Sequence, residues 1–164
     1  SSPSSACGSS RRRTDPLHVA AHQQFRAGVG IVVRHHDDER ILAFERSDIR
    51  DAWQLPQGGL DHGEGPVDAA WRELGEEAGL GPAEVELVGE HPDWVVYEVP
   101  SPKRGGKIGR GQVQRWFTFR ARRADIEPVP DGKEFRDWRW VEADWLVDHV
   151  VEFRRPGYRL VLRG

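Results

Sequence analysis

The sequence predicts an α/β fold in which a mixed β-sheet is sandwiched between α-helices. Two observations lead to this fold class. Runs of β-branched and aromatic residues occur in mixed order with amphipathic stretches, without the regular strand-helix-strand alternation of a doubly wound sheet. At 164 residues with 37% hydrophobic positions, the chain suits a single domain with one sizeable core.

The first half of the domain predicts two strands, a loop and a helix. "FRAGVGIVVR" at 25–34 and "RILAFER" at 40–46 predict strands that pair as a hairpin. The Pro/Gly-rich stretch "WQLPQGGLDHGEGP" predicts a loop. "PVDAAWRELGEEAGL" predicts a helix that begins at Pro66 and ends at Gly79.

The second half predicts four strands and two helices. Aromatic and β-branched residues favour strands at 84–90, 93–99, 113–122 and 135–142. Helices are expected at 143–153 and 158–163, with a break at Pro156-Gly157. We expect the domain to span residues 25–164. Residues 1–24 are Ser-rich and lack apolar periodicity, which predicts a flexible N-terminal tail, although the arginines at 11–13 would also suit RNA.

Cysteine content and hydropathy indicate the compartment. Cys7 is the only cysteine, which excludes an intramolecular disulfide and a cysteine metal site. No apolar run approaches the roughly 20 residues that are needed to span a bilayer, and no secretory signal follows the arginines at 11–13. We therefore expect a cytoplasmic protein without a membrane partner, and the oligomeric state stays open.

The charges are distributed unevenly around a net value of −3. Residues 64–98 carry ten acids and one base, whereas residues 99–124 carry eight bases and no acid. An acidic segment followed by a basic one is typical of a cation site beside an anion site. Two solvated faces would produce the same pattern.

The acidic segment is most crowded in "RELGEEAGL" at 72–80. At about 100° per residue, Glu73, Glu76 and Glu77 are expected to share one helix face, with Arg72 at its side. Carboxylates at this spacing repel by about 0.2–0.5 kcal/mol a pair, and Gly75 costs the helix roughly 1 kcal/mol more. A divalent cation would offset that repulsion. Oxygen ligands without cysteine favour Mg²⁺, with Mn²⁺ as the alternative, and Mg²⁺ in turn suits cleavage of a phosphoanhydride by water.

The spacing around these acids resembles a known family signature. Nine residues fit the pattern G-x5-E-x7-R-E-U-x-E-E-x-G-U, where U is aliphatic: Gly58, Glu64, Arg72, Glu73, Leu74, Glu76, Glu77, Gly79 and Leu80. The chain thus resembles the Nudix hydrolases at every defined position. The resemblance implies the Nudix fold and implies that Glu73, Glu76 and Glu77 bind the catalytic metal with the Gly58 carbonyl, that Glu64 assists, and that Arg72 orients the acids.

Segments outside this pattern resemble one branch of the family. "GRGQVQRWF", "EFRDWRWV" and "VVEFRR" are similar to bacterial RNA 5′-pyrophosphohydrolases and asymmetric diadenosine tetraphosphate hydrolases. By this resemblance Glu134 binds metal or acts as general base. The residues expected to bind the nucleoside polyphosphate or the RNA 5′ end are Arg26, Lys103, Lys107, Arg110, Tyr97, Val151 and Phe153.

Two other functions stay open at this point. One is a housekeeping hydrolase of mononucleotides or nucleotide sugars, which would not depend on Phe153 or on the basic loop. The other is a non-catalytic module that binds RNA or nucleotides. Loss of acids from the signature would indicate such a module, and none of the acids is missing.

Overall fold

The computed structural model describes residues 24–100 and 109–163. The expected tail up to residue 23 and the basic residues Lys103 and Lys107 lie outside the described residues. In the described part of the chain, no helix has the length and apolar character to cross a bilayer.

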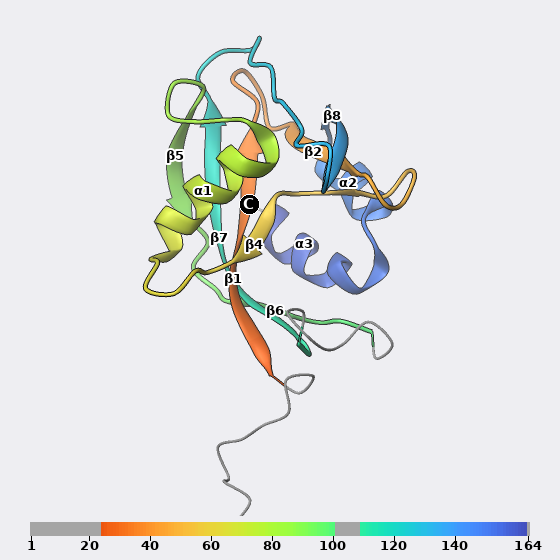
Figure 1. Ribbon diagram of the computed structural model, residues 1–164. Coiled ribbons are helices and arrows are strands. Elements are labelled where there is room, and N and C mark those ends of the chain that lie inside the picture. Colours follow the sequence, from red (N-terminus) through yellow and green to blue (C-terminus); the bar gives the residue numbers. More distant parts are fainter. Residues whose placement is uncertain (1–23, 101–108, 164) are drawn as a thin grey trace, which may run out of the picture.

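One eight-stranded mixed sheet forms the centre of the domain (Figure 1). β1 and β7 pair in parallel from Phe25 opposite Gly111 to Arg34 opposite Arg120. All other pairings are antiparallel, including the hairpin of β1 with β2 at Arg34 and Ile41. The strands are β1 (Phe25–Arg34), β2 (Ile41–Arg46), β3 (Trp53–Gln54), β4 (Gln57–Gly59), β5 (Val85–Glu90), β6 (Val95–Glu98), β7 (Gly111–Ala121) and β8 (Phe135–Val141).

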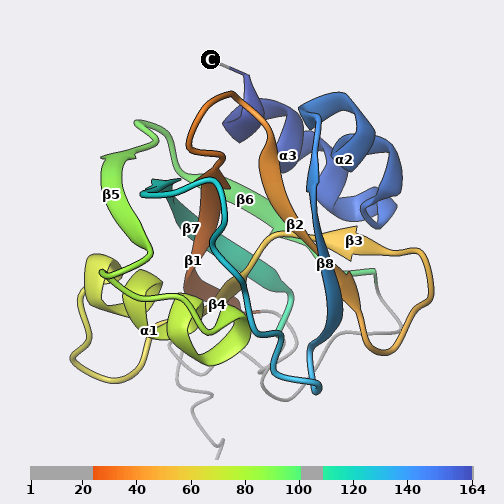
Figure 2. The ribbon, with the colours of Figure 1, turned by 90° about the horizontal axis from the view of Figure 1, so that it is seen from above.

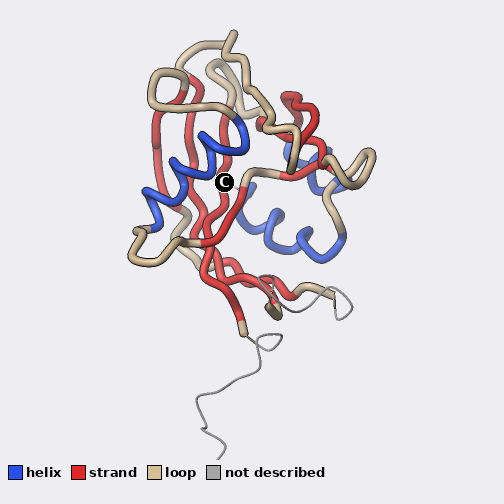
Figure 3. The backbone as a smooth tube through the Cα atoms, in the orientation of Figure 1, coloured by secondary structure: helices blue, strands red, loops and turns tan. Residues whose placement is uncertain are grey.

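Helices cover both faces of this sheet, which confirms the predicted α/β sandwich. Helix α1 (Pro66–Ala78) lies on one face, and α2 (Ala143–His149) and α3 (Arg155–Leu162) lie on the other (Figures 2 and 3). A 3₁₀ helix, η3 (Glu152–Arg154), leads into α3. The core is therefore split into two clusters, one under α1 around Leu74 and one under α2 and α3 around Trp116.

Helix α1 begins and ends where the sequence predicts. Pro66 occupies the first turn, where its missing N–H costs no hydrogen bond. Gly79 adopts the left-handed conformation with φ of 65°, and its N–H donates to the Gly75 carbonyl at 3.1 Å. A side chain at this φ would be strained, so Gly79 fixes the end of the helix.

Two expectations about local structure are wrong. The stretch expected to be a loop contains β3 and β4, because neighbouring strands β2 and β1 supply hydrogen-bond partners that the sequence does not reveal. The expected break at Pro156-Gly157 is absent, and both residues belong to the first turn of α3. Proline is tolerated in a first turn, so the helical path is interrupted earlier, at the extended residues Val150 and Val151.

Tyr158 attaches α3 to the segment that precedes the acidic helix. Its ring is 2% exposed and its hydroxyl accepts a hydrogen bond from the Leu55 N–H at 2.8 Å. Burial raises the pKa of this hydroxyl to about 12, so it stays protonated. Leu55 lies between β3 and β4, and this bond therefore fixes the strand that carries Gly58.

Removing that hydroxyl should destabilise the protein. In Tyr158→Phe the buried Leu55 N–H loses its partner, and we expect the free energy of unfolding to fall by about 1–3 kcal/mol. Denaturant titration would measure the change. Tyr97→Phe is the matched control, because its hydroxyl accepts only a 3.3 Å bond from a side-chain amide and should matter less. Equal losses in the two variants would contradict the assignment.

Candidate active site

Helix α1 divides the three crowded glutamates between two environments. Glu73 and Glu77 are buried, at 8% and 9% exposure. The side chain of Glu76 is 61% exposed. Arg72 Nη1 contacts both Glu73 and Glu76, so these acids share a side of α1 as expected, but they differ in burial. Residues 73 and 77 lie about one turn apart and face β4, whereas Glu76 faces solvent.

Arg72 connects these acids to the loop that follows β4. Its guanidinium donates to both carboxylate oxygens of Glu64 at 2.8 Å and to Glu73 Oε1 at 2.8 Å. It also donates to the Gly59 carbonyl at 2.9 Å and, more weakly, to Glu76 Oε2 at 3.3 Å. The Arg72 guanidinium, followed by a backbone N–H, lowers the pKa of Glu64 to about 2. Glu64 is therefore ionised at all physiological pH values.

Glu77 has no such basic partner. Burial raises its pKa to about 9, and the neighbouring Glu73 carboxylate adds to this effect. Burial also raises the pKa of Glu73, although Arg72 opposes it. Glu77 accepts a hydrogen bond from the Gln57 N–H at 3.2 Å, and no arginine or lysine of the described residues pairs with it. At neutral pH the buried Glu77 carboxyl therefore needs either a bound proton or a nearby cation.

Gly58 allows this close approach of α1 to β4. A Cβ atom at position 58 would overlap the Glu73 carboxylate, so any larger residue would displace that side chain. The Gly58 backbone thus lies beside Glu73, as the resemblance implied.

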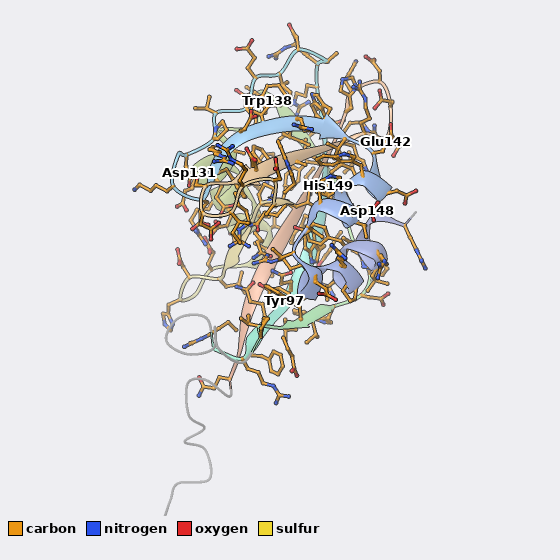
Figure 4. All side chains as sticks on the ribbon, turned by 90° about the vertical axis from the view of Figure 1, so that its right-hand side faces the viewer. Tyr97, Asp131, Trp138, Glu142, Asp148 and His149 are labelled. Carbon is orange, nitrogen blue, oxygen red and sulfur yellow. The ribbon has the colours of Figure 1, made fainter. Side chains whose placement is uncertain are left out.

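The loop before β8 brings two acids, Asp131 and Glu134, near Glu77. Asp131 accepts hydrogen bonds from the backbone N–H groups of residues 133–135 at 2.9–3.1 Å, which fixes the position of Glu134. The Asp131 N–H donates to the Glu77 carbonyl at 3.3 Å, so the loop is attached to the end of α1. Figure 4 shows Asp131 in this loop. Asp131 was not predicted as a site residue, because its contact with Glu77 joins positions that lie 54 residues apart in the chain.

Two clefts meet at Glu73. The first, which we call the acidic cleft, has a volume of about 330 Å³ and is lined by Arg46, Gln54, Gln57, Gly58, Glu73, Glu77, Gln112, Glu134 and Arg154. The second, the β1 cleft, has a volume of about 600 Å³ and is lined by Phe25, Arg26, Ala27, Gly59, Leu60, Asp61, Glu73 and Gln112. Acids and bases therefore face one another across a space that suits a charged ligand.

Arg154 is a further residue that the sequence analysis missed. Its guanidinium lies over the rings of Tyr97 and Phe153, at 5.1 and 5.3 Å from their centroids. Its Nε and Nη1 atoms are buried and make no hydrogen bond within the described residues. Buried donors without partners are rare in folded proteins, and at the wall of a cleft they indicate a site for an anion. The preceding Phe153 in "VVEFRR" was the only sequence signal.

Of the expected substrate residues that the structure describes, only Arg26 lines one of the two clefts, while Tyr97 and Phe153 contact Arg154 of the acidic cleft. Arg26 lines the β1 cleft, and Tyr97 contacts Phe153 with 5.7 Å between ring centroids. Figure 4 shows Tyr97 beside α3. Val151 packs against the core under α3. Arg110 pairs with Glu98 at 2.7 Å and lies over the Phe25 ring, 5.2 Å from its centroid, so it neighbours the β1 cleft but lines neither cleft.

The donor set fits a hard divalent cation. Glu73, Glu77 and Glu134 offer carboxylate oxygens, and the pKa of Glu77 is raised by burial and then by the neighbouring Glu73 carboxylate. However, no three acidic, histidine or cysteine side chains of residues 24–100 and 109–163 already converge as a metal site. Glu73 and Glu76 both contact Arg72 instead. A cation would therefore compete with Arg72 for these carboxylates.

The Glu77 pKa predicts a pH-dependent stability of the metal-free protein. The unfolded chain releases this proton near the ordinary value of 4.5, whereas the folded protein keeps it up to about 9. The folded state binds more protons between these values, so its stability falls as pH rises across this window. Glutamine does not titrate, so the Glu77→Gln variant should not lose this stability as pH rises.

Thermal unfolding in the presence of a chelator would measure the effect. We expect Glu77→Gln to raise Tm over the parent at about pH 9 and to change it little at about pH 5. Glu86→Gln, at an exposed position on β5, is the matched control and should show no such trend. A Tm difference for Glu77→Gln that did not vary with pH would contradict the assignment.

Comparison with known proteins identifies sequence relatives. Residues 24–161 match the family model of the NUDIX domain. An RNA pyrophosphohydrolase of Rhodospirillum rubrum is 43% identical over 148 residues, which cover 87% of this chain and 88% of that protein. An RNA pyrophosphohydrolase of Xanthomonas campestris is 41% identical over 145 residues, which cover 85% of this chain and 70% of that protein.

Solved structures share the fold at lower identity. The dihydroneopterin triphosphate pyrophosphohydrolase of Escherichia coli matches with a TM-score of 0.68 and 20% identity, covering 86% of this chain and 100% of that one. An Ap4A hydrolase of Caenorhabditis elegans matches with a TM-score of 0.64 and 18% identity, covering 83% and 94%. The domain match, the 43% identity and the shared fold lead to one conclusion: the chain belongs to the Nudix family of hydrolases.

Proposed function

We propose that this protein is a Mg²⁺-dependent pyrophosphohydrolase that cleaves phosphoanhydride bonds at 5′-triphosphorylated RNA ends or in diadenosine polyphosphates. The observation that carries the proposal is the acidic cleft, lined by the Glu73 and Glu77 carboxyls and by Arg154, whose Nε and Nη1 make no hydrogen bond within the described residues. Such a site suits a metal-bound polyphosphate. The names of the bacterial relatives favour RNA as the substrate.

Mg²⁺ would be held by Glu73, Glu76, Glu77 and Glu134, with the Gly58 carbonyl. Bound there, it would neutralise phosphate charge and make the attacking water more acidic. Arg72 keeps the acids in place through its bonds to Glu64 and Glu73. Manganese is the alternative metal, because carboxylate ligands suit both ions.

Glu134 is our candidate for the general base. It lines the acidic cleft and is exposed, so it can take up a proton from water and release it to solvent. The Glu134 N–H donates to Asp131, and this bond fixes the backbone from which the Glu134 carboxylate extends, near Glu77. Glu77 itself suits the role of metal ligand, since only a cation would displace its proton near neutral pH.

The opposite wall would bind the substrate. Arg154 offers two unused donors to phosphate, and Arg26 lines the adjoining β1 cleft. Phe153 is partly exposed and packs against the buried Tyr97, and an unpaired base would stack on such a ring with about 1–3 kcal/mol. This aromatic pair favours an RNA end or a dinucleotide over a simple triphosphate. Lys103 and Lys107 are expected to add phosphate contacts.

The first experiment compares substrates. Purified protein is incubated with Mg²⁺ and equal concentrations of short 5′-triphosphorylated RNA, diadenosine tetraphosphate and ATP, and every product is quantified. We expect pyrophosphate from the RNA at the highest kcat/KM. ATP with AMP from diadenosine tetraphosphate as the main products would assign the second substrate class. Preference for ATP would indicate a mononucleotide hydrolase. Absence of cleavage of all three substrates by the parent protein would overturn the proposed hydrolase activity.

Loss of one carboxylate should abolish most of the activity. Glu77→Gln removes a ligand for the cation, and we expect kcat to fall by about 100-fold or more. Glu134→Gln should lower kcat by about 10²–10⁴-fold if Glu134 is the general base. Glu86→Gln is the matched control and should keep the parent's rate. Full activity of Glu77→Gln would contradict the proposed metal site.

Phe153 should distinguish substrates with a base beyond the phosphates. In Phe153→Leu we expect KM for the RNA to rise about tenfold, because stacking is lost, while KM for ATP changes little. Steady-state kinetics on both substrates would measure the difference. Trp94→Leu, an exposed aromatic that lines neither cleft, should leave both values unchanged. Equal effects of Phe153→Leu on the two substrates would exclude base stacking at this position.

A further inference from the structure

Three glutamine side chains form a hydrogen-bonded row on the α3 face of the sheet. Gln57 belongs to β4, and Gln112 and Gln114 belong to β7. The Gln114 Nε2 donates to Gln57 Oε1 at 3.0 Å and to Gln112 Oε1 at 2.8 Å. Gln114 is 1% exposed, whereas Gln57 and Gln112 both line the acidic cleft. The row therefore extends from the core to the cleft.

Trp116 determines which way these amides are turned. An amide can be turned over with little change in shape, but an indole N–H is a donor only. The Trp116 Nε1 donates to Gln114 Oε1 at 3.1 Å, and Trp116 is 2% exposed. Gln114 must consequently direct its Nε2 at the other two glutamines, which in turn must present their oxygens to it.

The outer ends of the row are therefore donors. The Gln57 Nε2 donates to the Tyr97 hydroxyl at 3.3 Å. The Gln112 Nε2 has no hydrogen-bond partner within the part of the chain that the structure describes. Gln112 lines both the acidic cleft and the β1 cleft. Its free donor thus lies where the two clefts meet, beside Glu73.

Strand β1 leaves room for this arrangement. A Cβ atom at Gly28 would lie 2.6 Å from Gln112 Oε1, and one at Gly30 would overlap the Trp116 indole. Both glycines lie on β1 directly across from the glutamine row, since Gly28 pairs with Gln114 and Gly30 with Trp116. Side chains at these two positions would push Gln112 and Trp116 out of their observed places.

We propose that Gln112 binds the substrate by donating to a phosphate oxygen, and that Gln114 is the positioning residue that turns the Gln112 amide toward the clefts. Ionised phosphate oxygens accept hydrogen bonds and donate none, so an amide held with its Nε2 outward selects for them. The inference rests on the proposed function, because the substrate's polyphosphate supplies the acceptor. Gln112 lies between the clefts that contain Arg26 and Arg154, which would bind neighbouring phosphates.

A double-mutant cycle tests whether Gln114 acts through Gln112. Gln112→Met removes the donor and should raise KM about tenfold with a smaller change in kcat. Gln114→Met frees the Gln112 amide to turn over and should raise KM about three- to tenfold. The double variant should match Gln112→Met, because the positioned group is already gone. Additive effects, or an unchanged KM in either single variant, would overturn the proposal. Gln24→Met, outside both clefts, is the matched control.

NMR of the side-chain amides gives a readout that does not depend on activity. In the parent we expect nuclear Overhauser effects between the Gln57 amide protons and the Tyr97 ring, and their loss in Gln114→Met. Titration with inorganic tripolyphosphate and Mg²⁺ should shift the Gln112 amide signals of the parent. Retained Overhauser effects in Gln114→Met, or an unshifted Gln112, would overturn the inference. If these signals behave as expected while no substrate is cleaved, only the proposed function fails.

Discussion

The ion pairs of Arg72 are the interaction on which the rest of the site depends. One guanidinium binds Glu64, Glu73 and the Gly59 carbonyl, and so holds the loop after β4 against α1. Without it, the carboxylates of this segment would repel one another, by about 0.2–0.5 kcal/mol for each helical pair. Glu77 is left outside this network. The site therefore contains a neutralised group of acids and one buried carboxyl that is not neutralised.

Burial changes the protonation state of the acid that Arg72 does not neutralise. Burial and the neighbouring Glu73 carboxylate hold the Glu77 carboxyl in its protonated form, and its pKa rises to about 9. In the same acidic cleft, the Arg154 Nε and Nη1 atoms are without hydrogen-bond partners among residues 24–100 and 109–163. An unsatisfied buried polar group costs about 1–3 kcal/mol, and among the described residues of this cleft Arg154 carries such a cost. Under the proposed function, a metal-bound polyphosphate would supply a cation to Glu77 and acceptors to Arg154.

Glycines set how closely these groups approach. Gly58 on β4 leaves the space that the Glu73 carboxylate occupies, and Gly28 and Gly30 on β1 leave the space for Gln112 and Trp116. Each gap is filled from a neighbouring element, so functional side chains lie directly over the backbone of the sheet. A glycine in a strand weakens it, and here that cost permits close contact between the strand and its neighbours.

The sequence by itself determined the features that depend on neighbouring residues. The helix from Pro66 to Gly79, the acids at 73, 76 and 77 and the family signature lie within 23 consecutive residues, so their spacing could be read directly. The strong β-branched runs predicted β1, β2 and β7 for the same reason. Only the tertiary structure decided the rest. Parallel pairing of β1 with β7 brings Gln114 opposite Gly28, the loop at Asp131 docks onto α1, and η3 carries Arg154 over Tyr97. Likewise, β3 and β4 exist because β2 and β1 offer them hydrogen bonds, and Glu76 is exposed because packing against β4 selects positions 73 and 77. These contacts join segments far apart in the chain, and their partners are set by packing rather than by local residue pattern.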